Sequence, residues 1–180
     1  MKKWLPLIII AVIVIGIFRW GVGLNNTMVE KQETAKTQWA NVESAYQRRS
    51  DLIPNLVSTV KGYADFEKET LEAVIQARAN ATKTTIDPSN ISPDQMAAFQ
   101  ESQNSLSGAL SKLMVVVEKY PDLKANQNFL ELQSQLEGTE NRINVERNRF
   151  NEQAKDYNVY IRKFPATVVA GFLNFDQMAL

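Results

Sequence analysis

Two charged residues interrupt apolar helical repeats and are the first candidates for chemistry. Arg49 lies in line with apolar residues spaced three and four apart, and Glu146 lies between Ile143 and Phe150 in a second repeat. A guanidinium buried in such a seam needs a carboxylate and further hydrogen bonds, because an unpaired buried charge is strongly destabilising. We therefore predict a structural ion network that fixes helix register, with a docking site for a partner helix as the alternative. The predicted members are Arg48, Arg49, Asp51, Glu146 and Arg147.

The residue types that are missing limit the chemistry further. The sequence has no histidine and no cysteine, so thiolate sites and the Glu-x-x-His pairs of di-iron bundles cannot be built. It contains no glycine-rich phosphate loop and no nucleophile elbow. Its 20 basic and 20 acidic residues give no net charge, so the chain has no overall positive potential that would attract the phosphate backbone of a nucleic acid. We expect a protein that is not an enzyme, without cofactor, metal or nucleic-acid partner.

The N-terminal segment has the length of a membrane span. Residues 4–24 are apolar apart from Arg19, and as a helix they would extend over about 31 Å, close to the hydrocarbon thickness of a bilayer. Trp4, Arg19 and Trp20 are placed where interfacial residues belong. A cleaved signal peptide is the alternative, but Arg19 and Trp20 occupy the stretch that should lead into its cleavage site. We predict a retained signal anchor with a short linker over residues 1–27.

The orientation of this anchor follows from the flanking charges. Lys2 and Lys3 favour a cytoplasmic N-terminus, and Arg19, Lys31 and Lys36 on the other flank nearly balance them. We expect the N-terminus in the cytoplasm and the rest of the chain outside it.

The remainder of the chain reads as four long helices. Segments 28–63, 65–82, 96–120 and 126–163 each carry apolar residues at helical spacing. Six large apolar residues follow one another every seven positions in the last segment: Phe129, Leu136, Ile143, Phe150, Tyr157 and Phe164. Short connections make neighbouring helices antiparallel. The predicted fold class is all-α, an antiparallel up-down four-helix bundle over residues 28–165 that follows an N-terminal transmembrane helix.

The expected helix ends are marked by specific residues. Gly62 ends the first helix, and Ser92 followed by Pro93 is an N-cap with proline at the first helical position. Pro121 separates the third and fourth helices. Pro54 lies inside the first helix, where a proline costs about 3 kcal/mol. We expect a continuous but kinked helix there, because the apolar register is unbroken across it.

Two surfaces at the ends of the bundle are candidates for contacts. The turn farthest from the membrane gathers polar and aromatic residues that either dock a partner or cap the core: Asn55, Lys61, Tyr63, Tyr120 and Pro121. The last long helix returns to the bilayer, so the apolar tail over residues 166–180 should lie near lipid. This tail either contacts the membrane or a neighbouring subunit, or folds back on its own bundle. Its contact residues are Phe164, Val168, Phe172, Leu173 and Phe175.

Several motifs together resemble one family. They are RRSDLIPNLVSTVKGY at 48–63, EKYPDLKA at 118–125, FLELQ at 129–133, EGTENRI at 137–143 and RNRFN at 147–151. With the N-terminal anchor and the closing Phe164-Pro165, they are similar to the LemA family over residues 1–175. The resemblance implies a bacterial membrane protein with one transmembrane helix and a four-helix bundle, and it supplies no catalytic residues. Phe66 stands where such proteins often have histidine.

These observations predict a non-enzymatic scaffold or adaptor in the bacterial inner membrane. Unbroken heptads leave coiled-coil-like stripes that can pair between subunits, so we expect a homo-oligomer. The expected partners are the lipid bilayer, further copies of the chain and another membrane protein. Two alternatives are a membrane-remodelling protein that stabilises curvature and an accessory or regulatory partner of a membrane protease.

Overall fold

The computed structural model describes residues 4–63, 68–88 and 91–180, and over these residues the regular structure is entirely helical. The six helices in this part of the chain are α1 (Leu5–Lys61), α2 (Lys68–Lys83), α3 (Pro93–Val117), α4 (Pro121–Lys124), α5 (Gln127–Arg162) and α6 (Ala166–Leu173). The predicted all-α class with four long helices is confirmed. Phe66 lies outside the described residues.

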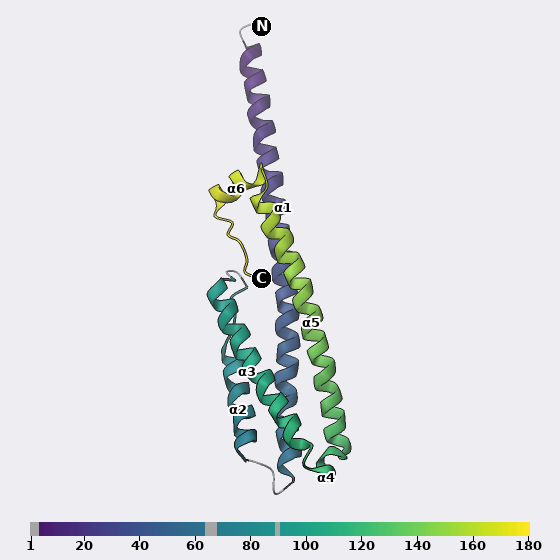
Figure 1. Ribbon diagram of the computed structural model, residues 1–180. Coiled ribbons are helices and arrows are strands. Elements are labelled where there is room, and N and C mark those ends of the chain that lie inside the picture. Colours follow the sequence, from purple (N-terminus) through teal and green to yellow (C-terminus); the bar gives the residue numbers. More distant parts are fainter. Residues whose placement is uncertain (1–3, 64–67, 89–90) are drawn as a thin grey trace.

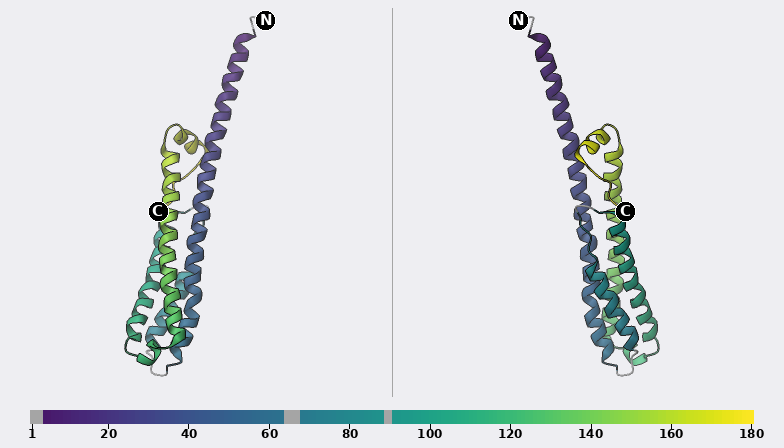
Figure 2. Two further views of the ribbon diagram at one scale, coloured as in Figure 1. Left: turned by 90° about the vertical axis from the view of Figure 1, so that its right-hand side faces the viewer. Right: turned by 90° about the vertical axis from the view of Figure 1, so that its left-hand side faces the viewer.

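The long helices run alternately away from and toward the N-terminal end (Figure 1). α1 and α5 lie against each other over most of their length, and α2 and α3 form a hairpin beside them. The N-terminal part of α1 projects alone beyond the bundle, α4 lies at the opposite tip, and α6 fills the space between the end of α5 and α1 (Figure 2). The arrangement is the up-down order expected from the short connections.

α1 joins the apolar N-terminal segment and the first bundle helix without interruption. It contains 57 residues, which corresponds to about 86 Å of helix. Its residues from Leu7 to Trp20 are exposed, and the helix is long and apolar enough to cross a membrane. Burial begins at Met28, which is fully buried. The segment expected to anchor the chain and the segment that packs the bundle are therefore one helix.

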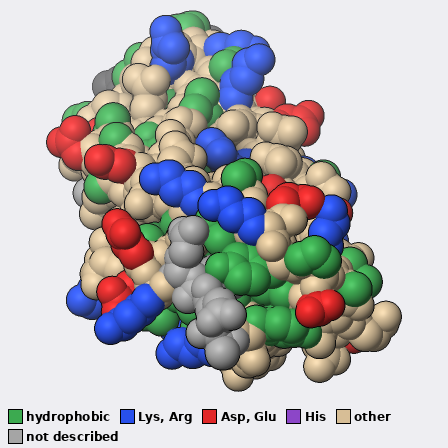
Figure 3. Space-filling view, turned by 60° about the horizontal axis from the view of Figure 1, so that its bottom comes forward, with side chains coloured by type: hydrophobic (Ala, Val, Ile, Leu, Met, Phe, Trp, Pro, Cys, Tyr) green, Lys and Arg blue, Asp and Glu red, His purple; other side chains and the backbone are tan. Residues whose placement is uncertain are grey.

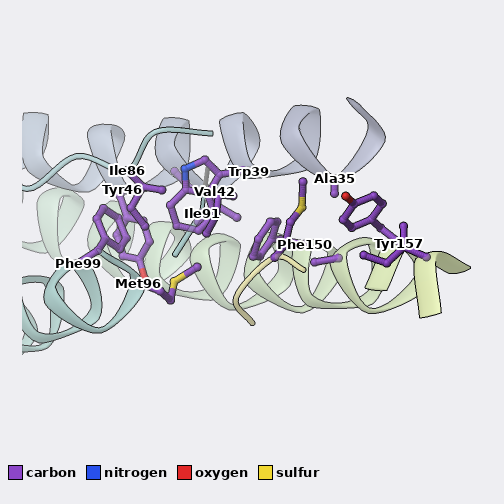
Figure 4. Close-up of a cluster of buried hydrophobic side chains, with 14 of the residues drawn as sticks. Ala35, Trp39, Val42, Tyr46, Ile86, Ile91, Met96, Phe99, Phe150 and Tyr157 are labelled. Atoms are coloured by element: carbon purple, nitrogen blue, oxygen red, sulfur yellow. The ribbon is translucent and has the colours of Figure 1, made fainter. Parts of the chain in front are cut away.

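Two apolar clusters form the core. The membrane-proximal cluster contains Trp39, Phe99 and Phe150, and the distal cluster contains Ile53 and Leu113. Figure 4 shows side chains from α1, α3, α5 and the loop before α3 pointing toward one another in the first cluster. Its aromatic rings meet edge to face, with the Trp39 ring centroid 5.0 Å from that of Phe150 and 5.4 Å from that of Phe99. Edge-to-face contacts add to the stabilisation from burial.

Local signals set the helix ends where the sequence predicts them. Ser92 caps α3, its side chain accepts a hydrogen bond from the backbone N–H of Gln95, and Pro93 occupies the first turn. Gly62 follows the last residue of α1. Two short helices were not predicted. α4 begins at Pro121, and α6 forms within the predicted apolar tail, for which no helix was predicted.

α1 continues through Pro54, as predicted, and a neighbouring helix compensates for the proline. Pro54 has no N–H, so the carbonyl of buried Ser50 has no partner four residues ahead. The Nε atom of Arg78 in α2 donates a hydrogen bond to this oxygen at 2.8 Å. A buried carbonyl without a donor is destabilising, so Arg78 makes the proline tolerable.

This compensation predicts a coupled pair of substitutions. Arg78→Met should lower the free energy of unfolding by about 1–3 kcal/mol, because the Ser50 carbonyl then lacks a donor. In a Pro54→Ala background the same change should cost clearly less, because the alanine N–H restores the helical hydrogen bond. Urea titrations of the four variants in mild detergent give the coupling energy. Equal costs in both backgrounds would show that Arg78 acts independently of Pro54.

Candidate functional site

A polar layer crosses the bundle between the two apolar clusters and centres on Arg49 of α1, which is 2% exposed. Its guanidinium donates to the Ser107 hydroxyl at 2.7 Å and to the Glu140 carboxylate at 2.8 Å. It also donates to the side-chain oxygen of Gln103 at 2.7 Å. The Gln103 amide in turn donates to the Ala81 carbonyl of α2 at 3.3 Å. One buried charge thus connects all four long helices.

The structure divides the predicted ion network into separate groups. Arg49 pairs with Glu140 rather than Glu146, whereas Arg48 and Asp51 are exposed on α1. Arg147 lies beside Tyr46, where its charge opposes the rise that burial produces in the pKa of this phenol. The physical reason is that Glu140 and Glu146 are six residues apart and so face different sides of α5.

Glu146 is the centre of the second group, which connects α5 to α1. Its carboxylate is 1% exposed and accepts a hydrogen bond from the Gln38 amide at 2.6 Å. Arg142 and Arg149 from its own helix form ion pairs with it at 2.7 and 3.2 Å. The hydrogen bond from Gln38 holds the pKa of Glu146 below its ordinary value, and both arginines act in the same direction, while burial opposes them.

The lowered pKa predicts how stability depends on pH. As pH falls, Glu146 is protonated in the unfolded chain before it is protonated in the folded chain, because its pKa is lower in the folded chain. Its contribution to stability is therefore complete above the ordinary pKa of 4.5 and is lost as pH falls through the pKa of the folded state. The Glu146→Gln variant should therefore lose less stability than the wild type between about pH 5 and pH 3. Urea titrations at several pH values measure this, with Glu152→Gln on the exposed side of α5 as the matched control. Parallel curves for wild type and Glu146→Gln would contradict the assignment.

The C-terminal segment forms a collar at the end of the bundle where the apolar part of α1 begins. α6 follows Pro165 and ends at Asn174, whose φ of 56° is left-handed and is tolerated by asparagine. One face of α6 packs through Ala166 and Ala170, which are 3% and 4% exposed. We call α6 and the residues that follow it to Leu180 the membrane-proximal collar.

Hydrogen bonds hold the end of the collar on the bundle. The Tyr157 hydroxyl donates to the Asp176 carbonyl at 2.9 Å, and burial, with the nearby Asp176 charge, raises the pKa of Tyr157 to about 12. The Asn158 side chain pairs with the backbone of Met178 through two hydrogen bonds of 2.8 and 2.9 Å. The predicted tail therefore folds back on its own bundle over one of its faces.

The other face of the collar is exposed and strongly apolar. In the collar Val168, Phe172 and Leu173 are 62%, 89% and 48% exposed, and Phe164, just before the collar, is 83% exposed. Phe175 differs, because it is partly buried against the membrane-proximal cluster. The exposed face lies beside α1 at the level of Phe18 to Asn25. A membrane or subunit contact thus remains a prediction for four of the five residues proposed from the sequence.

The anchor residues predicted to lie in the interface are also exposed. Trp4 is 70% exposed at one end of the apolar segment, and Trp20 is 55% exposed near the other end, next to exposed Arg19. Both ends of the segment therefore present the aromatic side chains that favour the interface of a bilayer.

The structure brings the predicted distal residues to one end of the bundle. The Tyr63 hydroxyl donates to the Asp122 carbonyl at 3.3 Å, which ties α1 to the start of α4. Tyr120 is half-buried, whereas Asn55, Lys61 and Pro121 are exposed. Figure 3 views this end and shows hydrophobic side chains surrounded by charges of both signs. Tyr63 thus helps to close the core, and a docking role of this end stays a prediction.

Among the described residues, no group of three or more carboxylates is arranged to hold a metal ion. A groove of about 720 Å³ between α1, the end of α2 and α3 is lined by hydroxyl and amide side chains such as Ser50 and Gln47, by the carboxylates of Glu43 and Asp51 and by apolar side chains such as that of Phe99. The sequence has no imidazole and no thiol, the side chains that most often serve as base and as activated nucleophile in catalysis. The groove offers hydrogen bonds, charges of both signs and shape.

Sequence reasoning missed the real partners of the buried charges. Gln103 and Arg78 lie in the apolar repeats of their helices, at positions that normally carry a hydrophobic side chain. A polar residue at such a position could have indicated that it binds a buried polar group. Glu140 and Gln38 carry no such signal, because one is exposed and the other only partly buried. Their roles follow from how the helices are aligned.

A family model and several known proteins match this chain. A model of the LemA family matches residues 38–180. The chain is 27% identical over 174 residues to "Protein LemA" of Metamycoplasma hominis, and the alignment covers 96% of this chain and 76% of that protein. It is 25% identical to "Magnetosome protein MamQ" of Magnetospirillum gryphiswaldense, with 85% of this chain and 62% of that protein covered.

The match to Magnetosome protein MamQ 2 of Paramagnetospirillum magneticum is equally partial, since 62% of that protein is covered. The chain therefore spans less than two thirds of the length of the magnetosome proteins that it matches. The family model, in contrast, covers well over half of this chain, including the polar layer and the collar. The apolar N-terminal helix is long and apolar enough to cross a membrane, and the chain belongs to the LemA family.

Proposed function

We propose that this protein is a non-enzymatic scaffold anchored in the bacterial inner membrane by α1. In this proposal the N-terminus is cytoplasmic, the bundle lies outside the cytoplasm, and the partners are other copies of the chain and another membrane protein. The groove beside α1 supports a binding role, because its hydroxyl, amide and charged side chains offer hydrogen bonds and ion pairs to a partner.

The observation that carries the proposal is the unbroken passage of α1 from the apolar segment into the core. A linker between anchor and bundle would let the bundle rotate freely, whereas a continuous helix fixes its direction relative to the membrane. From Met28 to Lys61 the helix rises about 51 Å. The protein is thus suited to hold its distal end at a set height above the bilayer.

The distal end is the proposed contact surface for a partner. It combines exposed Asn55, Lys61 and Pro121 with the aromatic rings of Tyr63 and Tyr120. Aromatic side chains surrounded by mixed charges are frequent at protein interfaces. The polar layer supports this surface indirectly, because it fixes the alignment of the helices that carry it.

Photo-crosslinking in living bacteria tests the scaffold. A photoreactive amino acid at Tyr63 or Tyr120 should form adducts with another copy of the chain or with another membrane protein. The same group at Asn158 of α5, which faces the collar, should form none with a partner. Insertion of four glycines after Asn26 should abolish the distal adducts, because the bundle loses its fixed direction. Adducts that survive this insertion unchanged, or a complete lack of adducts, would contradict the proposal.

The oligomer is tested separately. The purified full chain in mild detergent should show a mass in light scattering that rises above the monomer with concentration. A monomeric mass at every concentration would remove self-association from the proposed function and leave the adaptor role.

A membrane-remodelling role is the second candidate, and the exposed face of α6 favours it. An apolar helix that inserts into one leaflet beside a membrane span enlarges that leaflet and bends the bilayer. Electron microscopy of liposomes that carry the full chain distinguishes the two roles. Tubes or buds that disappear with Phe172→Ser and Val168→Ser would indicate remodelling, and unchanged vesicles would indicate the scaffold.

A further inference from the structure

An apolar groove lies between the membrane-proximal collar and α1. Its volume is about 410 Å³, and its walls are Phe18, Gly21, Val22 and Asn25 of α1 with Val168, Val169, Phe172 and Leu173 of α6. Asn25 is the sole polar side chain in this lining. The two walls come from the last turns of the apolar segment and from the exposed face of α6.

The position of the groove along α1 determines what surrounds it. The helix from Leu5 to Leu24 rises about 30 Å, which matches the hydrocarbon core of a bilayer. The groove lies at the far end of this stretch, level with Trp20, and so at the boundary between hydrocarbon and headgroups. Its walls continue the lipid-facing surface of α1, since Phe18 and Val22 are 71% and 42% exposed.

From this continuity we propose that the groove holds one acyl chain of a phospholipid from the leaflet in which α6 lies. The proposal rests on the proposed membrane span of α1. The groove is lined almost entirely by hydrocarbon, and transfer of methylene groups from water or headgroups into such a lining is favourable. Arg162 and Lys163 are exposed just before α6 and are placed to meet the phosphate of an anionic headgroup.

Gly21 gives the groove its depth. A Cβ atom built there meets no atom within 4 Å, so the glycine leaves space between α1 and α6. The first carbon of a side chain at this position would therefore fit without a clash, and the rest of a larger side chain would extend into the groove. Gly23 also has open space around its Cβ position, but it does not line the groove. The two glycines are therefore a matched pair at nearly the same depth.

The test uses the full chain in nanodiscs that contain a phosphatidylglycerol with a diazirine near the carbonyl end of one acyl chain. After illumination, mass spectrometry should find lipid adducts on both walls, around Val22 and around Val168 to Leu173. Gly21→Leu should reduce the α6 adducts roughly tenfold, because its side chain displaces about two methylene groups. Gly23→Leu should leave them unchanged. Both substitutions raise helix propensity, and circular dichroism checks that the fold is kept.

Each other outcome has a definite meaning. Adducts along α1 but none on α6 would contradict lipid binding in the groove and would still support the membrane span. A lack of adducts on both helices would contradict the membrane span and, with it, the proposed function. A second copy of the chain is the other possible occupant of the groove. Because the chain has no cysteine, a Phe172→Cys variant can form a disulfide only with the same residue of another copy. Rapid disulfide dimerisation of this variant in nanodiscs, with loss of the α6 adducts, would show that another copy of the chain fills the groove instead of lipid.

Discussion

Arg49→Ala should lower the free energy of unfolding by about 3–5 kcal/mol. The substitution leaves a cavity in the middle of the bundle and removes the donors that satisfy the side-chain oxygen of Gln103 and the hydroxyl of Ser107. Glu140 adds little to this loss, because its side chain is 48% exposed and can be hydrated. Urea titration of the full chain in mild detergent, followed by tryptophan fluorescence, measures the change.

The neighbouring arginine is the matched control for this prediction. Arg48 is exposed on the same turn of α1, so Arg48→Ala should change the free energy of unfolding by less than about 0.5 kcal/mol. Similar effects of the two substitutions would show that the Arg49 layer contributes no more than a surface charge.

A double substitution separates stability from alignment. Burial of a guanidinium is costly, and apolar replacements of buried ionic groups are often neutral or stabilising. Arg49→Met combined with Gln103→Leu should therefore recover most of the stability lost in Arg49→Ala. If the polar layer serves alignment, this variant should fold with normal stability but lose the distal crosslinks from Tyr63 and Tyr120. If the crosslinks from Tyr63 and Tyr120 are retained, the polar layer around Arg49 has no role in aligning the helices.

Trp39→Ala should destabilise the chain by a similar amount, about 3–5 kcal/mol. Trp39 is 2% exposed and packs edge to face with Phe99 of α3 and Phe150 of α5. Its loss therefore opens a cavity where three elements meet. Trp39→Phe should cost much less, because it keeps an aromatic ring and removes an indole N–H to which no described residue offers a hydrogen-bond acceptor.

Far-UV circular dichroism follows the unfolding of these variants, since the substitutions remove a fluorescent group. The control is Phe172→Ala, which truncates an aromatic side chain that is 89% exposed and should leave stability in detergent nearly unchanged. If Trp39→Ala were as mild as this control, the membrane-proximal cluster would not be a tightly packed core.

Signals that act within a few residues predicted the helices well. The heptad spacing located α1, α3 and α5, and the caps at Ser92 and Gly62 fixed ends that the structure confirms. The continuity of α1 through Pro54 followed from an unbroken apolar register. In each case the information lies in the same turn or the next turn of one helix, so no knowledge of neighbouring helices is needed.

The helix in the C-terminal collar could not be predicted in this way. α6 has eight residues and is apolar on nearly every side, so it is too short to display a helical period. It forms because Ala166 and Ala170 pack on the bundle and the bonds from Tyr157 and Asn158 hold the chain that follows. These contacts join residues from different elements and exist only after the bundle has assembled.

Three features can be predicted from the residues alone: an all-helical chain with an apolar leading helix, the ends of its long helices and a buried charge at Arg49. The pairing of this charge with Glu140 instead of Glu146, and the hydrogen bond from Arg78 to the carbonyl freed by Pro54, depend on how the helices pack together. The reason is the axial alignment of packed helices. A shift of one turn moves a helix by about 5.4 Å and brings a different side chain opposite each position, and repeating heptads leave that shift open.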